Sequence, residues 1–290
     1  MREFRRDDIV LDGRPCVDFC SNDYLGLASH PRVVEAFIAA ARTHGVGGRA
    51  SHLITGHQSE HEALEQELAA WTGRERAILF STGYMANLGV LGALCGPDDV
   101  IVSDSLNHAS IIDACRLSRA KTRVFRHNDP DDLARVAAGL GGGFRRRLLV
   151  VDGVYSMDGD VARLRTLVPI ARAHGLVVVL DDAHGLGVLG ANGRGVAEAE
   201  GVEVDLTIGN LGKALGSFGA FVACSARVRE YLVNASRSFI FTCAVAPPAL
   251  GAAREALRIV GAEPERRKLL LERAEQLRAG LRAAGYDTAH

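Results

Sequence analysis

Short apolar runs alternate with helix-like segments along most of the chain. In such runs every position is apolar, which is typical of strands buried on both faces, and the segments between them are long enough for crossover helices. One of these helices, 61–71, carries Leu64, Leu68 and Trp71 at helical spacing. The pattern predicts an α/β fold with a mostly parallel sheet flanked by helices, which binds ligands at the carboxyl ends of its strands. The predicted strands are 77–80, 99–102, 122–125, 148–151, 176–180 and 206–208.

The pattern changes after Pro247 and Pro248. Two amphipathic helices rich in arginine and glutamate are predicted there, at 249–260 and 265–284. No strand-rich unit follows them. We therefore expect one α/β domain with a helical extension.

Composition narrows the class of function. A formal net charge of −1 provides no field for binding nucleic acid or an anionic membrane. The six cysteines form no CxxC pair, which argues against a disulfide framework and against a zinc site. No run reaches the roughly 20 apolar residues of a membrane span. We expect a cytoplasmic protein without a metal, whose partners are small molecules.

Lys213 lies among glycines and is one of three lysines in the chain. Lysine can form a Schiff base, whereas arginine cannot. Asp181 follows an apolar strand, and His184 follows three residues later. A carboxylate that pairs with a ring nitrogen, a histidine and a lysine are what pyridoxal phosphate (PLP) chemistry requires. Asp182 is interpreted as a cap for the next turn.

Two predicted helix starts add candidate contacts. Gly83 and Tyr84 follow the strand 77–80, where backbone N–H groups at a helix N-terminus can bind a phosphate. His108 also follows a strand and opens a helix, so its ring is expected in the same crevice, stacked on the cofactor. His127 has no such context and is interpreted as a surface or core residue.

Several longer motifs resemble those of the α-oxoamine synthases, PLP enzymes that condense a small amino acid with an acyl thioester and release CO₂. The resemblance implies the large domain of a fold-type-I PLP-dependent transferase, with a mostly parallel seven-stranded sheet. The motifs lie at 19–27, 50–57, 107–110, 155–160, 181–185 and 211–216.

The resemblance also implies roles for single residues. Lys213 would be the catalytic lysine that holds the cofactor, with His108 as the second catalytic residue. Asn22 would line the substrate pocket, and Thr242 would reach the phosphate across a homodimer interface. The cofactor-binding residues implied by the resemblance are Lys213, Asp181, His184, His108, Gly83, Tyr84, Ser156, Asn210, Asp152 and Thr242.

Three departures from the family pattern stand out. Asn210 replaces the threonine that commonly binds the phosphate, although an amide can still donate a hydrogen bond. The N-terminal helix is expected to be short. The C-terminal small domain, which supplies an arginine for the substrate carboxylate, is expected to be largely missing. The implied division is an N-terminal segment (1–27), a PLP-binding large domain (28–245) and the helical start of a truncated small domain (246–290).

Within the family, the segments 51–57 and 217–222 favour a member that condenses L-alanine with a pimeloyl thioester in biotin biosynthesis. The thioester carrier, CoA or an acyl-carrier protein, stays open. Glycine C-acetyltransferase is the alternative, because 103–108 and 151–153 fit it equally well. An alternative of another class is a truncated, non-catalytic chain that binds PLP and dimerises.

Overall fold

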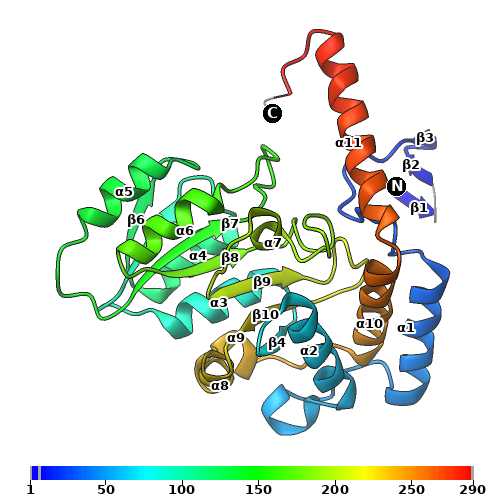
Figure 1. Cartoon of the computed structure of the whole chain (residues 1–290). Coiled ribbons are helices and arrows are strands. Elements are labelled where there is room, and N and C mark those ends of the chain that lie inside the picture. The colour runs from blue at the N-terminus through cyan, green and yellow to red at the C-terminus, as the bar shows by residue number, and fades with distance from the viewer. Residues whose placement is uncertain (1, 6–7, 289–290) are drawn as a thin grey trace.

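The central feature of the molecule is a seven-stranded sheet with helices on both faces (Figure 1). This is a computed structural model, and it describes residues 2–5 and 8–288. The outermost residues of the predicted N-terminal segment (1–27) and of the predicted start of a small domain (246–290) lie outside the described residues. The strand order is β4-β10-β9-β8-β7-β5-β6, and the predicted α/β class is confirmed. The strands are β4 (Arg76–Phe80), β5 (Val100–Asp104), β6 (Lys121–Phe125), β7 (Arg147–Asp152), β8 (Val177–Asp181), β9 (Leu206–Asn210) and β10 (Ala220–Cys224).

Six of these strands coincide with the predicted apolar runs. The seventh, β10, pairs antiparallel with both β4 and β9, so the sheet is mostly but not wholly parallel. The apolar pattern misses β10 because its run directly follows the glycine-rich connection 211–219. All five residues of β10 are buried, which fits its place between two strands.

Successive side chains of the strands supply two separate apolar layers. On one face, β-strand residues pack with α3, α4, α8 and α9; on the other, α5, α6 and α7 cover one half of the sheet, and α1, α2 and α10 cover the half at β4 and β10. The helices are α1 (Pro31–His44), the π-helix η1 (His52–Gly56), α2 (Ser59–Thr72), α3 (Gly83–Leu94), α4 (Ala109–Ser118), α5 (Pro130–Ala138), α6 (Leu164–Ala173), α7 (Val196–Glu200), α8 (Ala226–Ala235), α9 (Arg237–Ile240), α10 (Pro247–Ala262) and α11 (Glu265–Ala283).

The two ends of the chain differ in how well they match expectation. The two C-terminal helices are confirmed as α10 and α11; α10 packs into the core, and α11 extends away from the sheet (Figure 1). The prediction of a short N-terminal helix is wrong, because β1 (Arg2–Arg5), β2 (Asp8–Leu11) and β3 (Arg14–Cys16) form a small antiparallel sheet. A tight turn explains the difference: Asp12 and Gly13 both have positive φ and reverse the chain between β2 and β3.

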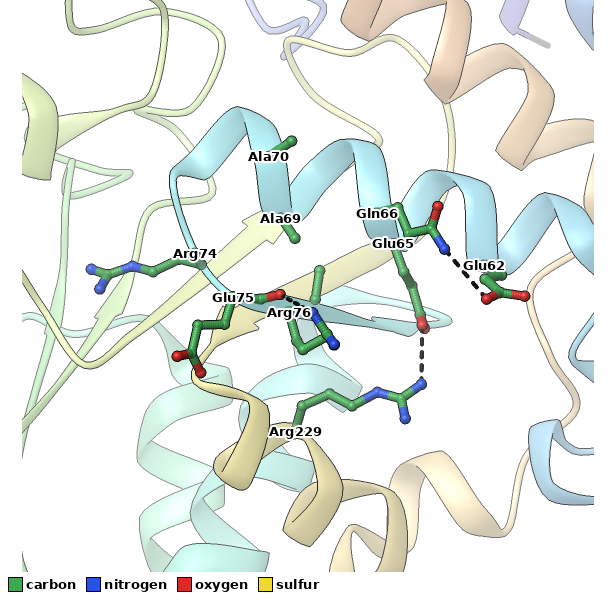
Figure 2. Close-up of a pocket in the computed structure, with 10 residues that line it drawn as sticks. Glu62, Glu65, Gln66, Ala69, Ala70, Arg74, Glu75, Arg76 and Arg229 are labelled. Carbon is green, nitrogen blue, oxygen red and sulfur yellow. Dashed lines mark hydrogen bonds and ion pairs between the residues drawn. The ribbon is translucent and has the colours of Figure 1, made fainter.

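A buried carboxyl group binds the edge strand β4 of the central sheet. Edge strands present unpaired backbone groups that must be satisfied or covered. Glu65 of α2 accepts a hydrogen bond from the backbone N–H of Leu79 in β4, at 3.0 Å, and lies 3.3 Å from the guanidinium of Arg229 in α8. Figure 2 shows Glu65 and Arg229 among the residues that line a cavity of about 550 Å³. Glu65 therefore joins α2, the edge strand and α8.

This carboxyl group should make stability depend on pH. Burial raises the pKa of Glu65 to about 7, against the opposing effects of Leu79 and Arg229, from an ordinary value of 4.5. The folded chain then binds a proton that the unfolded chain has released, so the free energy of unfolding falls as pH rises through this range. Urea unfolding at pH 5 and pH 8 is expected to show a loss of about 2–3 kcal/mol that the Glu65→Gln variant lacks.

The matched control is Glu35→Gln, which removes an exposed carboxylate from α1, a helix that does not carry Glu65. It should follow the wild-type pH dependence. Parallel pH profiles for the wild type and Glu65→Gln would contradict the assignment.

Candidate active site

Polar residues at the carboxyl ends of three neighbouring strands lie side by side. Asp152 ends β7, Asp181 ends β8 and Asn210 ends β9, and the two aspartates are partners in the strand register. Because these strands are parallel, their ends open on the same edge of the sheet, where α/β folds bind ligands. The cavity there is lined by Gly83, Tyr84, His108, Ser110, Asp152, Ser156, Asp181, Ala183, His184, Asn210 and Lys213.

Of the predicted cofactor residues, all except Thr242 line this cavity. Their individual roles stay predictions. Thr242 lies half-buried beyond the end of α9 and is not a lining residue. Asn22, the predicted substrate residue, is exposed and also lies outside the lining.

Lys213 enters the cavity from the connection between β9 and β10. Gly216 lets this connection pack closely on the N-terminal segment: its φ is +56°, and a Cβ there would lie 2.3 Å from the backbone nitrogen of Ala28. The Lys213 Nζ lies 2.8 Å from His184 Nε2. Burial lowers the pKa of Lys213, although Asp181 and Asp152 act in the opposite direction. A lowered pKa favours the neutral amine, the form that reacts as a nucleophile.

Asp181 is held by donors from two elements. One carboxylate oxygen accepts a hydrogen bond from Asn87 Nδ2 of α3 at 2.6 Å, and the other accepts from the backbone N–H of Ala183 at 3.1 Å. Asn87 also donates to Ser110 of α4, at 3.0 Å, and is fully buried. Asn87 is a functional candidate that sequence reasoning misses, because only the folded chain brings α3 beneath the end of β8.

Asp152 lies beside Asp181 and is also buried. Its carboxylate accepts a hydrogen bond from the backbone N–H of His108 at 2.7 Å. Burial, reinforced by the charge of Asp181, raises the pKa of Asp152 to about 8. The site therefore contains more carboxyl groups than its own cations neutralise.

Asp182 turns away from the cavity, as its interpretation as a cap requires. Its carboxylate accepts a hydrogen bond at 2.7 Å from the backbone N–H of Val196, the first residue of α7. A Cβ on Gly195 would lie 1.8 Å from this carboxylate, so glycine is required there. The two adjacent aspartates therefore have different tasks.

Two helix N-termini border the cavity, as predicted. Thr82 caps α3 through a hydrogen bond from the backbone N–H of Met85, which leaves Gly83 at the first helical position. A Cβ on Gly83 would lie 3.2 Å from the amide nitrogen of Asn210. The backbone N–H groups of α3 and the Asn210 amide thus face a common space that suits an anion.

His108 is the N-cap of α4 as well as a lining residue. Its Nδ1 accepts from the backbone N–H of Ser110 at 3.2 Å and lies 2.7 Å from the hydroxyl of the same residue. The cap fixes the direction of the imidazole ring.

His127 has a structural task that its sequence context does not reveal. Its two ring nitrogens each lie 2.9 Å from a carboxylate, one of Asp104 at the end of β5 and one of Asp160. Burial alone would lower the pKa of His127, but the hydrogen bonds and charges of the two aspartates raise it. Asp160 belongs to the loop that carries Ser156, so His127 holds this loop against β5.

Other parts of the described chain offer no comparable chemistry. The cavity beside Glu65 is larger, but neither a lysine nor a histidine lines it. Within residues 2–5 and 8–288 there is no group of three or more histidine, cysteine or acidic side chains arranged to bind a metal ion. In the same residues, no helix combines the length and the apolar character needed to cross a membrane.

The lining residues fit PLP on their own chemistry. A cationic ring nitrogen would stabilise the adjacent carboxyl groups of Asp152 and Asp181, since burial, and next the charge of Asp181, raise the pKa of Asp152. The phosphate would face the start of α3 and Asn210, and Lys213 would supply the amine.

Comparison with known proteins agrees with this chemistry. The family profile described as "Aminotransferase class I and II" matches residues 14–290. The chain is 50% identical over 282 residues to the 8-amino-7-oxononanoate synthase of Alkalilimnicola ehrlichii, covering 96% of this chain and 72% of that protein. It is 51% identical over 281 residues to the enzyme of the same name from Methylococcus capsulatus, again covering 96% and 72%.

A solved structure extends the comparison to the fold. The serine palmitoyltransferase from S. paucimobilis, solved with a bound PLP–myriocin aldimine, superposes with a TM-score of 0.95 at 35% identity. The match covers 99% of this chain and 72% of that one. The resemblance seen in the motifs is confirmed: the chain belongs to the class I and II aminotransferase family and, within it, to the α-oxoamine synthases.

Proposed function

We propose that the chain is a PLP-dependent acyltransferase that condenses L-alanine with a pimeloyl thioester and releases CO₂, giving 8-amino-7-oxononanoate for biotin biosynthesis. The observation that carries the proposal is the cavity at Lys213, where a half-buried amine, two carboxyl groups and two imidazoles converge. The two relatives at 50% and 51% identity, both 8-amino-7-oxononanoate synthases, support this substrate pair. Glycine C-acetyltransferase is not favoured.

When bound, PLP supplies an electron sink that stabilises negative charge on the α-carbon of an attached amino acid. The chain's own residues perform the remaining tasks. Asp181, fixed by Asn87 and Ala183, would hold a proton on the ring nitrogen. Lys213 would first anchor the cofactor and, once released by the substrate amine, remove and return the α-proton.

His184, His108 and Ser156 would orient the cofactor from its other sides. Burial, and next the charge of Lys213, lower the pKa of His184 to about 4, so its imidazole is neutral at physiological pH. A neutral imidazole can accept or donate one hydrogen bond at each nitrogen, depending on its tautomer. His108 would stack on the ring, in the direction that its capping bonds determine.

The proposal includes a homodimer. Thr242 and its neighbour Phe241 lie outside the cavity of their own chain, and the Phe241 side chain is 70% exposed. Ile54 of η1 is also exposed. The backbone N–H of Ala244 donates a hydrogen bond to the carbonyl oxygen of Ala50, just before η1. These segments would form a shared face that brings Thr242 to the partner's phosphate site. We also infer a cytoplasmic location, which the six free cysteines support.

A second candidate function, a chain that binds PLP without turnover, is supported by the residues that line the cavity. Among its described lining residues there is no arginine for a substrate carboxylate. The chain spans about 72% of the length of the two relatives. The division into a cofactor unit (28–245) and the start of a small domain (246–290) stays a proposal; of the two helices in the second part, α10 packs on the central sheet and α11 extends away from it. A chain that binds PLP and dimerises without turnover is therefore the candidate to test against.

One experiment separates these functions. The PLP-loaded chain is incubated with L-alanine and pimeloyl-CoA or pimeloyl-carrier protein, and with glycine and acetyl-CoA, while thiol release is recorded. We expect release with L-alanine, lowered by about 100-fold or more in Lys213→Ala because its proton transfer is lost. Release with glycine alone would contradict the proposal.

Borohydride reduction followed by peptide mass spectrometry provides the independent readout. The pyridoxyl adduct is expected on Lys213 and absent from Lys213→Ala, whereas Lys268→Ala, an exposed lysine of α11, should keep it. An adduct on Lys213 without thiol release from either donor would support the non-catalytic candidate.

The homodimer has its own test. Thr242→Val is expected to weaken PLP binding by about tenfold, since one hydrogen bond to a charged phosphate is lost. If Thr242 acts across the interface, mixing the Lys213→Ala and Thr242→Val chains should form heterodimers with one intact site, which recover the wild-type affinity in part. A monomer in analytical ultracentrifugation, or no recovery on mixing, would contradict the shared site.

A further inference from the structure

A chain of hydrogen bonds leads from Lys213 to the N-terminal segment. Lys213 Nζ lies 2.8 Å from His184 Nε2, and His184 Nδ1 lies 2.7 Å from the hydroxyl oxygen of Tyr24. The Tyr24 hydroxyl in turn donates to Oδ1 of Asn22 at 3.2 Å. The four residues come from three stretches of the sequence, which only the fold brings together: Tyr24 and His184 are 160 positions apart, and His184 and Lys213 are 29 apart.

Counting the hydrogens along this series of hydrogen bonds determines where the imidazole proton lies. A tyrosine hydroxyl carries one hydrogen, and that hydrogen is directed to Asn22. The contact between Tyr24 and His184 therefore needs its hydrogen from Nδ1 of the imidazole. A neutral imidazole has one N–H, so Nε2 is left with a lone pair, which faces the amine of Lys213.

The ionisation states of the participants agree with this count. Burial raises the pKa of Tyr24, so its hydroxyl keeps its hydrogen. The lowered pKa of His184, caused first by burial and then by Lys213, keeps the imidazole neutral. Tyr24 is half-buried, and its ring is tilted by 49° against the imidazole, so the contact is made by the hydroxyl and not by stacking.

Tyr24 is also firmly placed by its neighbours. The Asp23 carboxylate accepts hydrogen bonds from the backbone N–H groups of Leu27 and Ala28, which closes a tight turn. Leu25 and Leu27 are buried in the same apolar cluster as residues of the Lys213 connection. The segment that presents Tyr24 is thus fixed relative to Lys213, as a positioning device must be.

We propose that Tyr24 is a positioning residue that holds His184 in the Nδ1–H tautomer and so directs the Nε2 lone pair to Lys213. The hydroxyl of Tyr24 and the amide of Asn22 then form the outer end of this series of hydrogen bonds, at the exposed rim of the site. This assigns a task to the N-terminal segment that the predicted substrate role of Asn22 does not include.

The direct test is the tautomer itself. In the full chain without added cofactor, labelled with ¹⁵N-histidine, two-bond ¹H–¹⁵N correlations identify which ring nitrogen of His184 carries the proton. A His184→Gln variant assigns the signals. We expect Nδ1–H in the wild type and a shift toward Nε2–H, or toward a mixture, in Tyr24→Phe, because the phenyl ring accepts no hydrogen bond from Nδ1.

Two further variants keep the test decisive. Tyr231→Phe removes a hydroxyl from α8, which contributes no residue to the lining of the cavity, and should leave the His184 signals unchanged. Asn22→Ala leaves Tyr24 in place but removes its acceptor, so the hydroxyl can donate to Nδ1 and the proton should move to Nε2. An Nε2–H tautomer in the wild type, or an unchanged Nδ1–H tautomer in Tyr24→Phe, would overturn the proposal.

A kinetic consequence rests on the proposed function. With L-alanine and the pimeloyl thioester, Tyr24→Phe should lower kcat by roughly 10- to 100-fold, with a smaller effect on KM, because the imidazole of His184 is no longer held in place relative to Lys213. The two failures can be told apart. If the wild type shows the tautomer but no turnover, the proposed function fails and the role of Tyr24 stands; if kcat is unchanged while the tautomer shifts, Tyr24 positions His184 without serving the reaction, and the kinetic part is overturned.

Discussion

The site depends on two carboxyl groups that are buried side by side. Asp152 and Asp181 stand in register at the ends of β7 and β8, where the low dielectric of the interior makes their repulsion costly. Asn87 and two backbone N–H groups hold them in place, and Lys213 is the basic side chain that faces them. Burial, and next the charge of Asp181, raise the pKa of Asp152, so a further positive charge beside the two carboxyl groups would stabilise their ionised forms. In the proposed function, a protonated pyridine nitrogen would supply this charge.

The fold explains how such a costly arrangement persists. The strands beneath the site are apolar on both faces and buried in three clusters, so the energy that stabilises the sheet comes from layers that do not include the site. Helix α3 begins at the site and carries Asn87 one turn further in, while the connection with Lys213 is pinned between β9 and β10. The reactive groups are therefore attached to the rigid part of the molecule, in a place where ordinary packing would exclude them.

Most of this could be predicted from the sequence, and the failures have physical causes. Apolar runs predict strands that are buried on both sides, but an antiparallel strand such as β10 has the same composition as a parallel one. Asp181, His184 and Lys213 stand out because their residue types match the chemistry. Asn87, His127 and Tyr24 do not, since their tasks arise from partners far away in sequence: Asp181, Asp160 and His184, respectively.

The central claim is that the buried Asp181 carboxylate binds the cofactor through its ring nitrogen. The most direct measurement is the PLP affinity of the wild type and of Asp181→Asn at neutral pH, followed by the absorbance of the bound cofactor. A charged hydrogen bond contributes about 1.5–3 kcal/mol, so we predict roughly 10- to 100-fold weaker binding by the variant. Equal affinities, with the chain folded in both cases, would contradict the account.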